Sequence, residues 1–224
     1  DSCDPIAGVH HVAVSTDDGD ACTTDSCDAA TGVHHVAVSS DDGDACTTDS
    51  CDDVGGCIND DTPHAGCLAA PKSILLLKQG GAGSKDKLLW KWIKGAAVTP
   101  MQLGDPSASA DYALCIYAGG TLVASSELPS GVRWSPLNGG YQYSDPAGSP
   151  SGILKALLKS GGTGKAKVLV KGKGNNLPDP ALGSLATPVT TQLVNTSSGF
   201  CVGASYGAGN VVKIDSAQFK AKTP

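Results

Sequence analysis

The feature that most constrains this chain is an internal duplication at its N-terminal end. Asp1–Thr24 reads DSCDPIAGVHHVAVSTDDGDACTT, and Asp25–Thr48 repeats it with four differences. A third copy begins at Asp49 with DSCD and then diverges. Self-similarity at a fixed period is typical of a linear array in which each unit contacts mainly its neighbours. We therefore expect residues 1–70 to form a repeat arm.

The charged residues divide the chain at the end of this arm. Residues 1–71 contain fifteen Asp and no Lys, Arg or Glu, whereas residues 72–224 hold all sixteen Lys and Arg against six Asp and one Glu. The formal charges are therefore −15 and +9, which sum to the net charge of −6. We predict two parts, an acidic arm at 1–70 and a separate domain at 71–224. Because the arm has no aromatic residue, disulfides, metal ions or a partner surface must hold it.

Seven of the nine cysteines lie in residues 1–67. Their C-x4-C spacing does not suit zinc, so disulfides in an oxidising, extracellular location are the better interpretation. Spacing alone leaves the connectivity open, and the odd count leaves Cys3 to pair with another chain or an upstream repeat. Two further cysteines lie in apolar strands of the second domain, where the alternative to a bond is two buried thiols. The candidate pairs are Cys22–Cys27, Cys46–Cys51, Cys57–Cys67 and Cys115–Cys201.

The sequence DDGDACTTDSCD occurs at Asp17–Asp28 and again at Asp41–Asp52. Carboxylates crowded around a glycine turn suit Ca²⁺, which takes six to eight oxygens at about 2.3–2.6 Å. A divalent ion would also relieve the repulsion among the carboxylates. The alternative is a solvated linker, or a turn in which Asp accepts from local amides. The predicted calcium ligands are Asp17, Asp18, Asp20, Asp25, Asp28, Asp41, Asp42, Asp44, Asp49 and Asp52.

Between the Asp-rich segments, GVHHVAVS at Gly8–Ser15 and Gly32–Ser39 predicts a β-strand from its β-branched residues. A lone strand is not stable in water, so it must pair with its sister repeat, its own domain or a neighbouring molecule. Adjacent histidines point to opposite faces of a strand, so we interpret them as strand residues with metal binding a minor alternative. The predicted assembly residues are Val9, His11, Ala13, Val33, His35 and Ala37.

The second part contains all three Trp, all five Tyr and both Phe, enough for a core. Short apolar runs between Gly, Pro, Ser and Asn turns predict an all-β fold, a β-sandwich preceded by an extended, disulfide-rich acidic arm. Leu75–Gly95 and Ala156–Gly174 read as one hairpin copied twice, and we expect the copies in the two layers of the sandwich. The predicted strands are Ser73–Lys78, Lys87–Lys94, Tyr112–Tyr117, Thr121–Ser125, Gly131–Trp134, Gly140–Tyr143, Ile153–Lys159, Lys167–Lys171, Val189–Asn195, Phe200–Ala204 and Val211–Ile214.

Catalytic motifs find little support. The second part has no His, and its one Glu is Glu127, so the usual general bases are absent and we expect no enzyme. Lysines alternate with apolar residues along the predicted strands, which is typical of a solvated sheet face and argues against nucleic acid. No apolar run approaches the roughly 18 residues of a transmembrane helix. Asn195-Thr196-Ser197 is a glycosylation sequon, and the Thr/Ser-rich repeats could carry sugar.

DDGDACTTDSCDAATG resembles the tandem repeats (DDGDxCTxDxCDxxTGxC) of secreted and surface proteins of environmental bacteria, and the resemblance covers residues 1–67. Val9 and Val33 stand where that pattern has a third cysteine, and Cys57 keeps it. The second part, with KLLWKWIKGAA and KVLVKGKGNNLP, resembles an uncharacterised β domain that accompanies such repeats. The whole is similar in organisation to subunits of bacterial extracellular filaments.

The charge division suggests a function. An acidic arm can lie on the basic domain of another copy, and head-to-tail contacts of this kind do not close on themselves. Our hypothesis is a secreted structural subunit whose copies assemble into an extracellular filament. The alternative is a monomeric calcium-dependent adhesin or carbohydrate-binding module on a repeat stalk, with Trp90 or Trp92 stacking on sugar.

Overall fold

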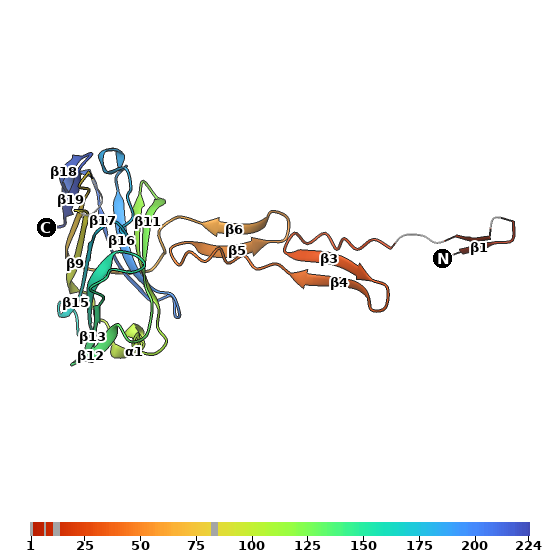
Figure 1. Cartoon of the computed structure of the whole chain (residues 1–224), viewed down its shortest axis with the longest axis horizontal. Coiled ribbons are helices and arrows are strands. Elements are labelled where there is room, and N and C mark those ends of the chain that lie inside the picture. The colour runs from red at the N-terminus through yellow and green to blue at the C-terminus, as the bar shows by residue number, and fades with distance from the viewer. Residues whose placement is uncertain (1, 7, 11–13, 82–84) are drawn as a thin grey trace. The chain divides into compact units, whose positions relative to one another are not determined.

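The computed structural model describes residues 2–6, 8–10, 14–81 and 85–224. The chain forms two compact units, one made of Asp1–Asp42 with Asp49–Asp60 and the other of Gly43–Thr48 with Asp61–Pro224. Both are built from β-strands, which confirms the predicted all-β class (Figure 1). The second unit includes two stretches of the acidic segment, 43–48 and 61–70. Among the described residues, the helices are too short and too polar to cross a bilayer.

The first unit is a series of two-stranded antiparallel hairpins, one for each repeat. The turns of the second and third hairpins are shaped by an Asp and a Gly of the DSCD-x3-G sequence. In the second repeat, Asp28 Oδ1 accepts hydrogen bonds from the Ala30 and Thr31 amides, and Gly32 adopts a φ of 89° that favours glycine. The hairpins are β1 (Ser2–Asp4) with β2 (Gly8–His10), β3 (Thr23–Asp28) with β4 (Gly32–Ala37), and β5 (Thr48–Asp52) with β6 (Gly56–Asp60).

The GVHHVAVS strand therefore finds its partner in the segment that directly precedes it. The other strand of the hairpin is TTDSCD, which the sequence analysis interprets as part of a calcium loop. In β3–β4, Val33 is opposite Cys27, His35 opposite Asp25 and Ala37 opposite Thr23. Pairing with a sister repeat or a neighbour is not needed for this strand to form. Of the other assembly residues predicted, His11, Ala13 and the side chain of Val9 lie outside the described part of the chain.

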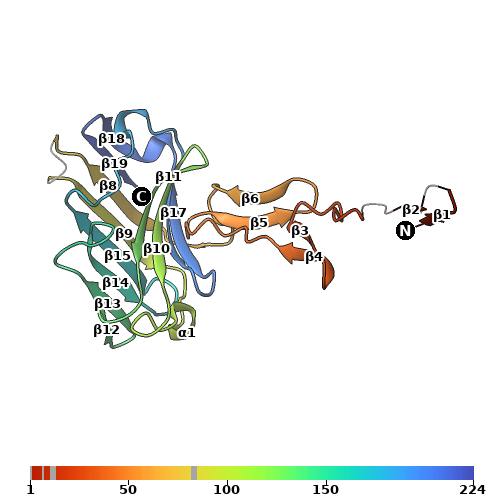
Figure 2. The same ribbon diagram turned by 45° about the vertical axis from the view of Figure 1, so that its right-hand side comes forward.

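The second unit is a sandwich of two sheets, seen as separate layers in Figure 2. One sheet has the strand order β12-β13-β14-β15-β9-β8-β19-β18, and the other has the order β11-β10-β16-β17-β7. The elements are β7 (Leu68–Ala69), β8 (Lys72–Lys78), β9 (Lys87–Gly95), α1 (Pro100–Leu103), β10 (Tyr112–Ala118), β11 (Thr121–Leu128), β12 (Trp134–Leu137), β13 (Gly140–Ser144), β14 (Ile153–Lys159), β15 (Ala166–Lys173), η1 (Leu182–Ser184), β16 (Val189–Asn195), β17 (Cys201–Tyr206), η2 (Ala208–Asn210), β18 (Val211–Asp215) and β19 (Gln218–Lys222).

Period-2 alternation builds the core between the two sheets. In β9, Leu88, Trp90 and Trp92 point inward and are buried, while the residues between them are more exposed. The indole Nε1 of Trp92 donates to the Gly203 carbonyl at 3.1 Å and so links the two layers. Because Trp90 and Trp92 are buried, they cannot stack on a sugar. This contradicts the role that the carbohydrate-binding alternative gives to them.

The duplicated hairpins, β8–β9 and β14–β15, lie in the same sheet, so the expectation of one copy in each layer is wrong. They meet through their second strands, because β15 pairs antiparallel with β9 and places Val168 opposite Trp92. The inward residues of both copies thus contribute to one continuous core face. Joining the copies side by side forms the four central strands of the larger sheet.

The interior strand β10 of the smaller sheet is buried on both faces. Tyr112, Leu114 and Ile116 face the sandwich core, whereas Ala113, Cys115 and Tyr117 belong to a second buried cluster on the outer face. That outer cluster is completed by three residues from the acidic segment, Ala45, Cys46 and Cys67. Segments 43–48 and 61–67 therefore cover a sheet face that would otherwise expose apolar side chains.

Candidate functional site

The Asp-rich segments fold through hydrogen bonds to their own backbone. Asp17, Asp18 and Asp20 each accept from the amide two residues later, at 2.8–2.9 Å, and Asp44 accepts from the Cys46 amide in the same way. Gly19 and Gly43 both adopt a φ of 77°, which these turns require. The local-amide interpretation of these residues is therefore correct for one oxygen of each side chain.

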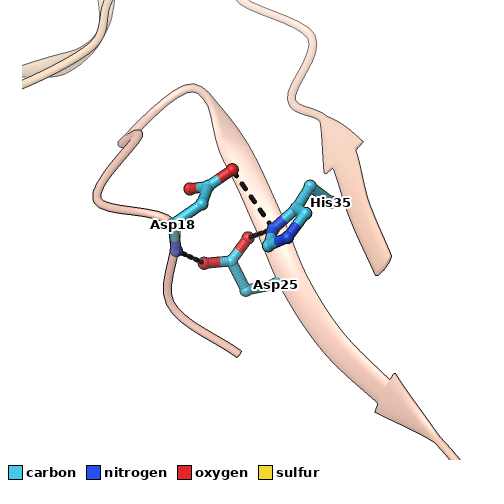
Figure 3. Close-up of side chains that lie close together, drawn as sticks. All are labelled: Asp18, Asp25 and His35. Carbon is cyan, nitrogen blue, oxygen red and sulfur yellow. Dashed lines mark hydrogen bonds and ion pairs between the residues drawn. The ribbon is translucent and has the colours of Figure 1, made fainter. Parts of the chain in front are cut away.

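In the segment 15–38, two of the predicted ligands meet a histidine (Figure 3). His35 Nδ1 lies 2.7 Å from Asp25 Oδ1 and 3.1 Å from Asp18 Oδ2. The sequence pattern alone does not reveal this contact, because it depends on β3 pairing with β4 so that Asp25 and His35 are opposite each other. The hydrogen bond between them lowers the pKa of the Asp25 carboxyl and raises the pKa of the His35 imidazole. A protonated His35 thus supplies a positive charge between two carboxylates.

In the segment 39–60, three carboxylates lie close together without a histidine. Oxygens of Asp41, Asp42 and Asp49 all lie within 4.8 Å of one another. Asn59 occupies the sequence position that His35 holds one period earlier. The Asp49 Oδ1 atom is fully buried and has no hydrogen-bond partner among the described residues. A buried carboxylate oxygen without a partner is costly, so this donor set fits a hard cation better than the His35 cluster does.

The remaining predicted ligands serve other purposes. Asp28 and Asp52 accept from turn amides of their hairpins and join neither of these carboxylate clusters. Asp44 Oδ2 accepts from the Ser125 hydroxyl of β11 at 3.2 Å, so this residue contacts the sandwich. Asp20 lies near Asp53 and Cys22, but Cys22 is in a disulfide and offers no thiolate. These placements correct the expectation of two complete five-carboxylate sites.

The disulfides join Cys22 to Cys51, Cys46 to Cys115 and Cys67 to Cys201, so every predicted pairing is wrong. Among the described side chains, Cys27 and Cys57 are exposed thiols. Cys22 directly precedes β3 and Cys27 lies near the end of this strand, so five residues of extended chain separate them by about 16 Å, far beyond the roughly 7 Å limit for a bridge. The same spacing applies to Cys46 and Cys51.

The pair Cys115–Cys201 fails for a different reason. Cys115 is on β10 and Cys201 on β17, and β16 lies between these strands. Two strand spacings separate the residues by about 9.6 Å, which again exceeds the reach of a disulfide. Each cysteine of the sandwich bonds instead to a cysteine of the segments that cover the outer face.

The loop Gly-Asp-Ala-Cys-Thr-Thr has the same role in both copies. In Gly19–Thr24, Cys22 bonds to Cys51 and the Ala21 amide donates to the Asp53 carbonyl at 2.7 Å, so the loop docks on the following repeat. In Gly43–Thr48, Cys46 bonds to Cys115 and its carbonyl accepts from the Tyr117 hydroxyl at 2.7 Å, so the loop docks on the sandwich. Each loop therefore fastens its repeat to the module that follows.

The outward face of the larger sheet is basic. On β8, β9, β14, β15 and β19, the residues between the core positions are Lys alternating with half-exposed Leu and Ile. Among the described residues, no ion pair joins a carboxylate to these lysines, whereas Lys213 on β18 pairs with Asp215. We call this surface the lysine face, and it comprises Lys72, Lys78, Lys87, Lys91, Lys155, Lys159, Lys167, Lys171, Lys173, Lys220 and Lys222 with the interspersed aliphatic residues.

Asn195, the predicted glycosylation site, is 1% exposed at the end of β16. Its side-chain Nδ2 donates to the Leu103 carbonyl at 3.2 Å, and its Oδ1 accepts from the Ser197 amide. An attached sugar would require this nitrogen to be accessible, so the folded sandwich contradicts the prediction for Asn195.

A family described as a Dictyostelium (slime mold) repeat matches residues 15–38 and 39–60. The match covers the two segments in which a DDGD sequence leads into a DSCD sequence, and it supports the repeat arm. The family takes its description from a slime mould, so it adds nothing to the expected bacterial source or the expected likeness to filament subunits. No curated protein and no solved structure matches the chain.

The pairing of His35 and Asp25 predicts a defined pH response. We expect titration by NMR to place the pKa of His35 above 6.5 and that of Asp25 below 3.8, because each charged group favours the other. The stabilisation through His35 is complete below pH 6.5 and is lost as the pH rises through the raised pKa. The stabilisation through Asp25 is complete above pH 3.8 and is lost as the pH falls through the lowered pKa. The ion pair therefore persists between the two folded-state pKa values.

Asp25→Asn is the informative variant for this response. It removes the main cause of the shift, so the pKa of His35 should move back toward 6.5, while Asp215→Asn, a matched charge change in the other unit, should leave the imidazole titration unaltered. An unchanged His35 titration in the Asp25 variant would contradict the assignment.

Proposed function

We propose that this protein is an extracellular structural subunit that assembles head to tail, with the acidic repeats of one copy on the basic sandwich of the next. The observation that carries the proposal is the lysine face, a flat surface of one charge sign in a chain whose other part has the opposite sign. The first unit contains no Lys or Arg at all. Charge complementarity of this kind orients the two partners and raises their association rate. Contacts between two different surfaces can repeat from copy to copy without forming a closed ring.

The size and chemistry of the lysine face suit a protein partner. Five strands at about 4.8 Å spacing and seven residues at about 3.3 Å give a surface of roughly 500 Å². A standard interface buries about 800 Å² on each partner, so this face with part of its rim would suffice. The aliphatic side chains between the lysines, such as Leu76, Leu89 and Leu169, are half-buried and would add apolar contact to the charge pairing.

The disulfides support an extracellular location for this assembly. Three bonds, one within the repeats and two at the sandwich, would not persist in a reducing compartment. The alternative of a monomeric carbohydrate-binding module loses support because Trp90, Trp92 and Trp134 are all buried. A calcium-dependent adhesin remains the second candidate, since the Asp41–Asp42–Asp49 cluster suits a hard cation.

Electron microscopy in negative stain, with sedimentation velocity over a range of concentrations, tests the assembly. The wild-type protein should form particles that lengthen with concentration and shorten in high salt, because screening weakens the charge contacts. Lys91→Glu with Lys171→Glu should abolish lengthening, since it inverts the charge at the centre of the lysine face. Lys165→Glu, in the exposed turn between β14 and β15, is the matched control and should still assemble. Monodisperse particles of the wild type under all these conditions would overturn the proposal.

We propose in addition that Ca²⁺ binds at Asp41, Asp42 and Asp49. Calorimetric titration should detect one site of this type, and Asp49→Asn should weaken it by about tenfold or more, equivalent to about 1.4 kcal/mol, because a neutral amide replaces the negatively charged carboxylate. Asp179→Asn carries the same charge change on the other unit and should leave the affinity unchanged. Equal calcium affinity in both variants, or no binding by the wild type at millimolar calcium, would exclude the ion from this cluster.

A further inference from the structure

One loop of the repeats is bonded to a hairpin further along the chain, and its contacts identify a receptor for such loops. The loop at Gly19–Thr24 contacts three features of the β5–β6 hairpin. Cys22 bonds to Cys51, the Ala21 amide donates to the Asp53 carbonyl, and a Cβ added at Gly56 would lie 3.7 Å from the Ala21 carbonyl oxygen. A hairpin cysteine, a turn carbonyl and a glycine of positive φ thus together receive one loop.

The β3–β4 hairpin carries the same three features one period earlier. They are Cys27, the backbone of Ala29, and Gly32, whose φ of 89° is close to the 79° of Gly56. The Asp28 and Asp52 side chains make matching bonds to their turn amides, so the two turns have the same form. Here, however, the receptor is open: Cys27 is an exposed thiol, and no described atom lies within 4 Å of a Cβ placed at Gly32.

Cys27 has no cysteine opposite it in its own hairpin with which it could form a disulfide. The residue opposite it on β4 is Val33. The two loop cysteines of the chain, Cys22 and Cys46, are already bonded. The loop that fits this receptor therefore belongs to a repeat other than the two whose loops are placed.

We infer that Cys27 is the acceptor site for the Asp-Gly-Asp-Ala-Cys loop of a further repeat, joined in the same order as Cys22 and Cys51. The sequence separation of that bond is 29, so the donor cysteine stands 29 residues before its acceptor. In this arrangement each repeat has a donor loop, whose cysteine bonds to the next module, and an acceptor hairpin, whose cysteine bonds to the donor loop of the previous repeat. In the sandwich, Cys115 takes the acceptor role for the loop at Gly43–Thr48.

The covalent step is an ordinary thiol oxidation. The Cys27 thiol and the loop thiol lose two electrons and two protons to oxidised glutathione, whose S–S bond is cleaved to give two glutathione thiols, while the new S–S bond forms. Docking of the loop on Ala29 and Gly32 would select this partner over other thiols. The inference is independent of filament assembly, since it concerns the order of bonds along one chain.

The test is a chain extended by one copy of the Asp25–Thr48 sequence placed before Asp1. After oxidation in glutathione buffer, alkylation and non-reducing peptide mapping should find Cys27 bonded to the cysteine of the added Asp-Ala-Cys-Thr segment and protected from alkylation. Cys57 should stay reactive as an internal reference. The matched control carries the same extension with that one cysteine replaced by serine, and Cys27 should then be alkylated as in the unextended chain.

Three results would overturn the inference. One is a Cys27 that remains alkylated in the extended chain. Another is a bond from the added loop cysteine to Cys3, which is the nearer hairpin cysteine in sequence and would indicate local pairing. The third is a bond between Cys27 residues of two copies, visible as a dimer on a non-reducing gel.

Discussion

Replacing Cys46 and Cys115 together by alanine is expected to lower the melting temperature of the sandwich by on the order of 10 °C. The bond closes a loop with a sequence separation of 69, and loop-closure entropy assigns about 4 kcal/mol to a cross-link of that length. For a unit of this size, each kcal/mol shifts the midpoint by about 2–4 °C. Both cysteines are 0% exposed in the cluster that covers the outer face of β10, so some packing is lost as well.

The matched control for this variant is Cys22→Ala with Cys51→Ala. That pair removes a disulfide of the same kind from the repeat unit, so the unfolding transition of the sandwich should stay within experimental error of the wild type. Differential scanning calorimetry of both double variants makes the comparison. Equal sandwich transitions in the two variants would show that the loop at Gly43–Thr48 does not stabilise the sandwich.

Trp92→Ala is expected to destabilise the sandwich by about 3–5 kcal/mol, the usual cost of removing a large buried aromatic side chain. Trp92 is 0% exposed, and its indole donates to the Gly203 carbonyl across the two layers. A Cβ added at Gly95 would lie 1.8 Å from this ring, which shows how closely the ring is enclosed. Removal therefore leaves a cavity and loses the hydrogen bond between the layers.

Denaturation in guanidinium chloride, followed by circular dichroism, measures the effect of Trp92→Ala. Trp92→Phe retains most of the apolar volume but loses the donor, so its midpoint should fall between those of the wild type and the alanine variant. Met101→Ala, at a side chain that is 90% exposed, is the control and should change stability by less than about 0.5 kcal/mol. A Trp92→Ala midpoint equal to that of Met101→Ala would contradict the core assignment.

Most of the sandwich follows from period-2 patterns that are visible in the sequence. KLLWKWIK alternates lysine and apolar residues at the period of a strand, and β9 has the inward face that this alternation requires. Of the predicted strands, Gly131–Trp134 is displaced, since β12 begins at Trp134 after a turn at Gly131. The strand β19 was missed even though Phe219 and Ala221 alternate with polar residues, because its run is short and of mixed polarity.

The disulfides could not be predicted because they depend on contacts that are distant in sequence. Spacing favoured Cys22–Cys27, but TTDSCD forms a strand that holds these residues apart. The correct partner, Cys51, belongs to the next repeat, and the partner of Cys46 is in β10. The sequence of β10 did contain a signal, because its seven consecutive residues are all apolar. A sandwich strand with apolar residues on both faces needs a cover on its outer side.

The sequence predicts that carboxylates gather in clusters, but it does not predict which Asp residues form each cluster. The sequence indicates carboxylates near a glycine turn, and Asp18, Asp25, Asp41, Asp42 and Asp49 do gather in two groups. Membership depends on which residues shape turns and which face across the hairpin. That distinction requires the register of β3 and β4, which also brings His35 into the first group.

The order of the disulfides has a mechanical consequence for any chain that is pulled from its two ends. Force entering before Cys22 crosses directly to Cys51, continues to Cys67, and crosses to Cys201 before reaching the C-terminus. The 134-residue separation between Cys67 and Cys201 encloses the strands from β7 to β16, so roughly 450 Å of contour length stays out of the load path, whereas β18 and β19 follow Cys201 and remain in it. In a single-molecule pulling experiment the oxidised protein should therefore extend only through residues outside the bonded loops, among them β18 and β19, and the length between Cys67 and Cys201 should be released after reduction.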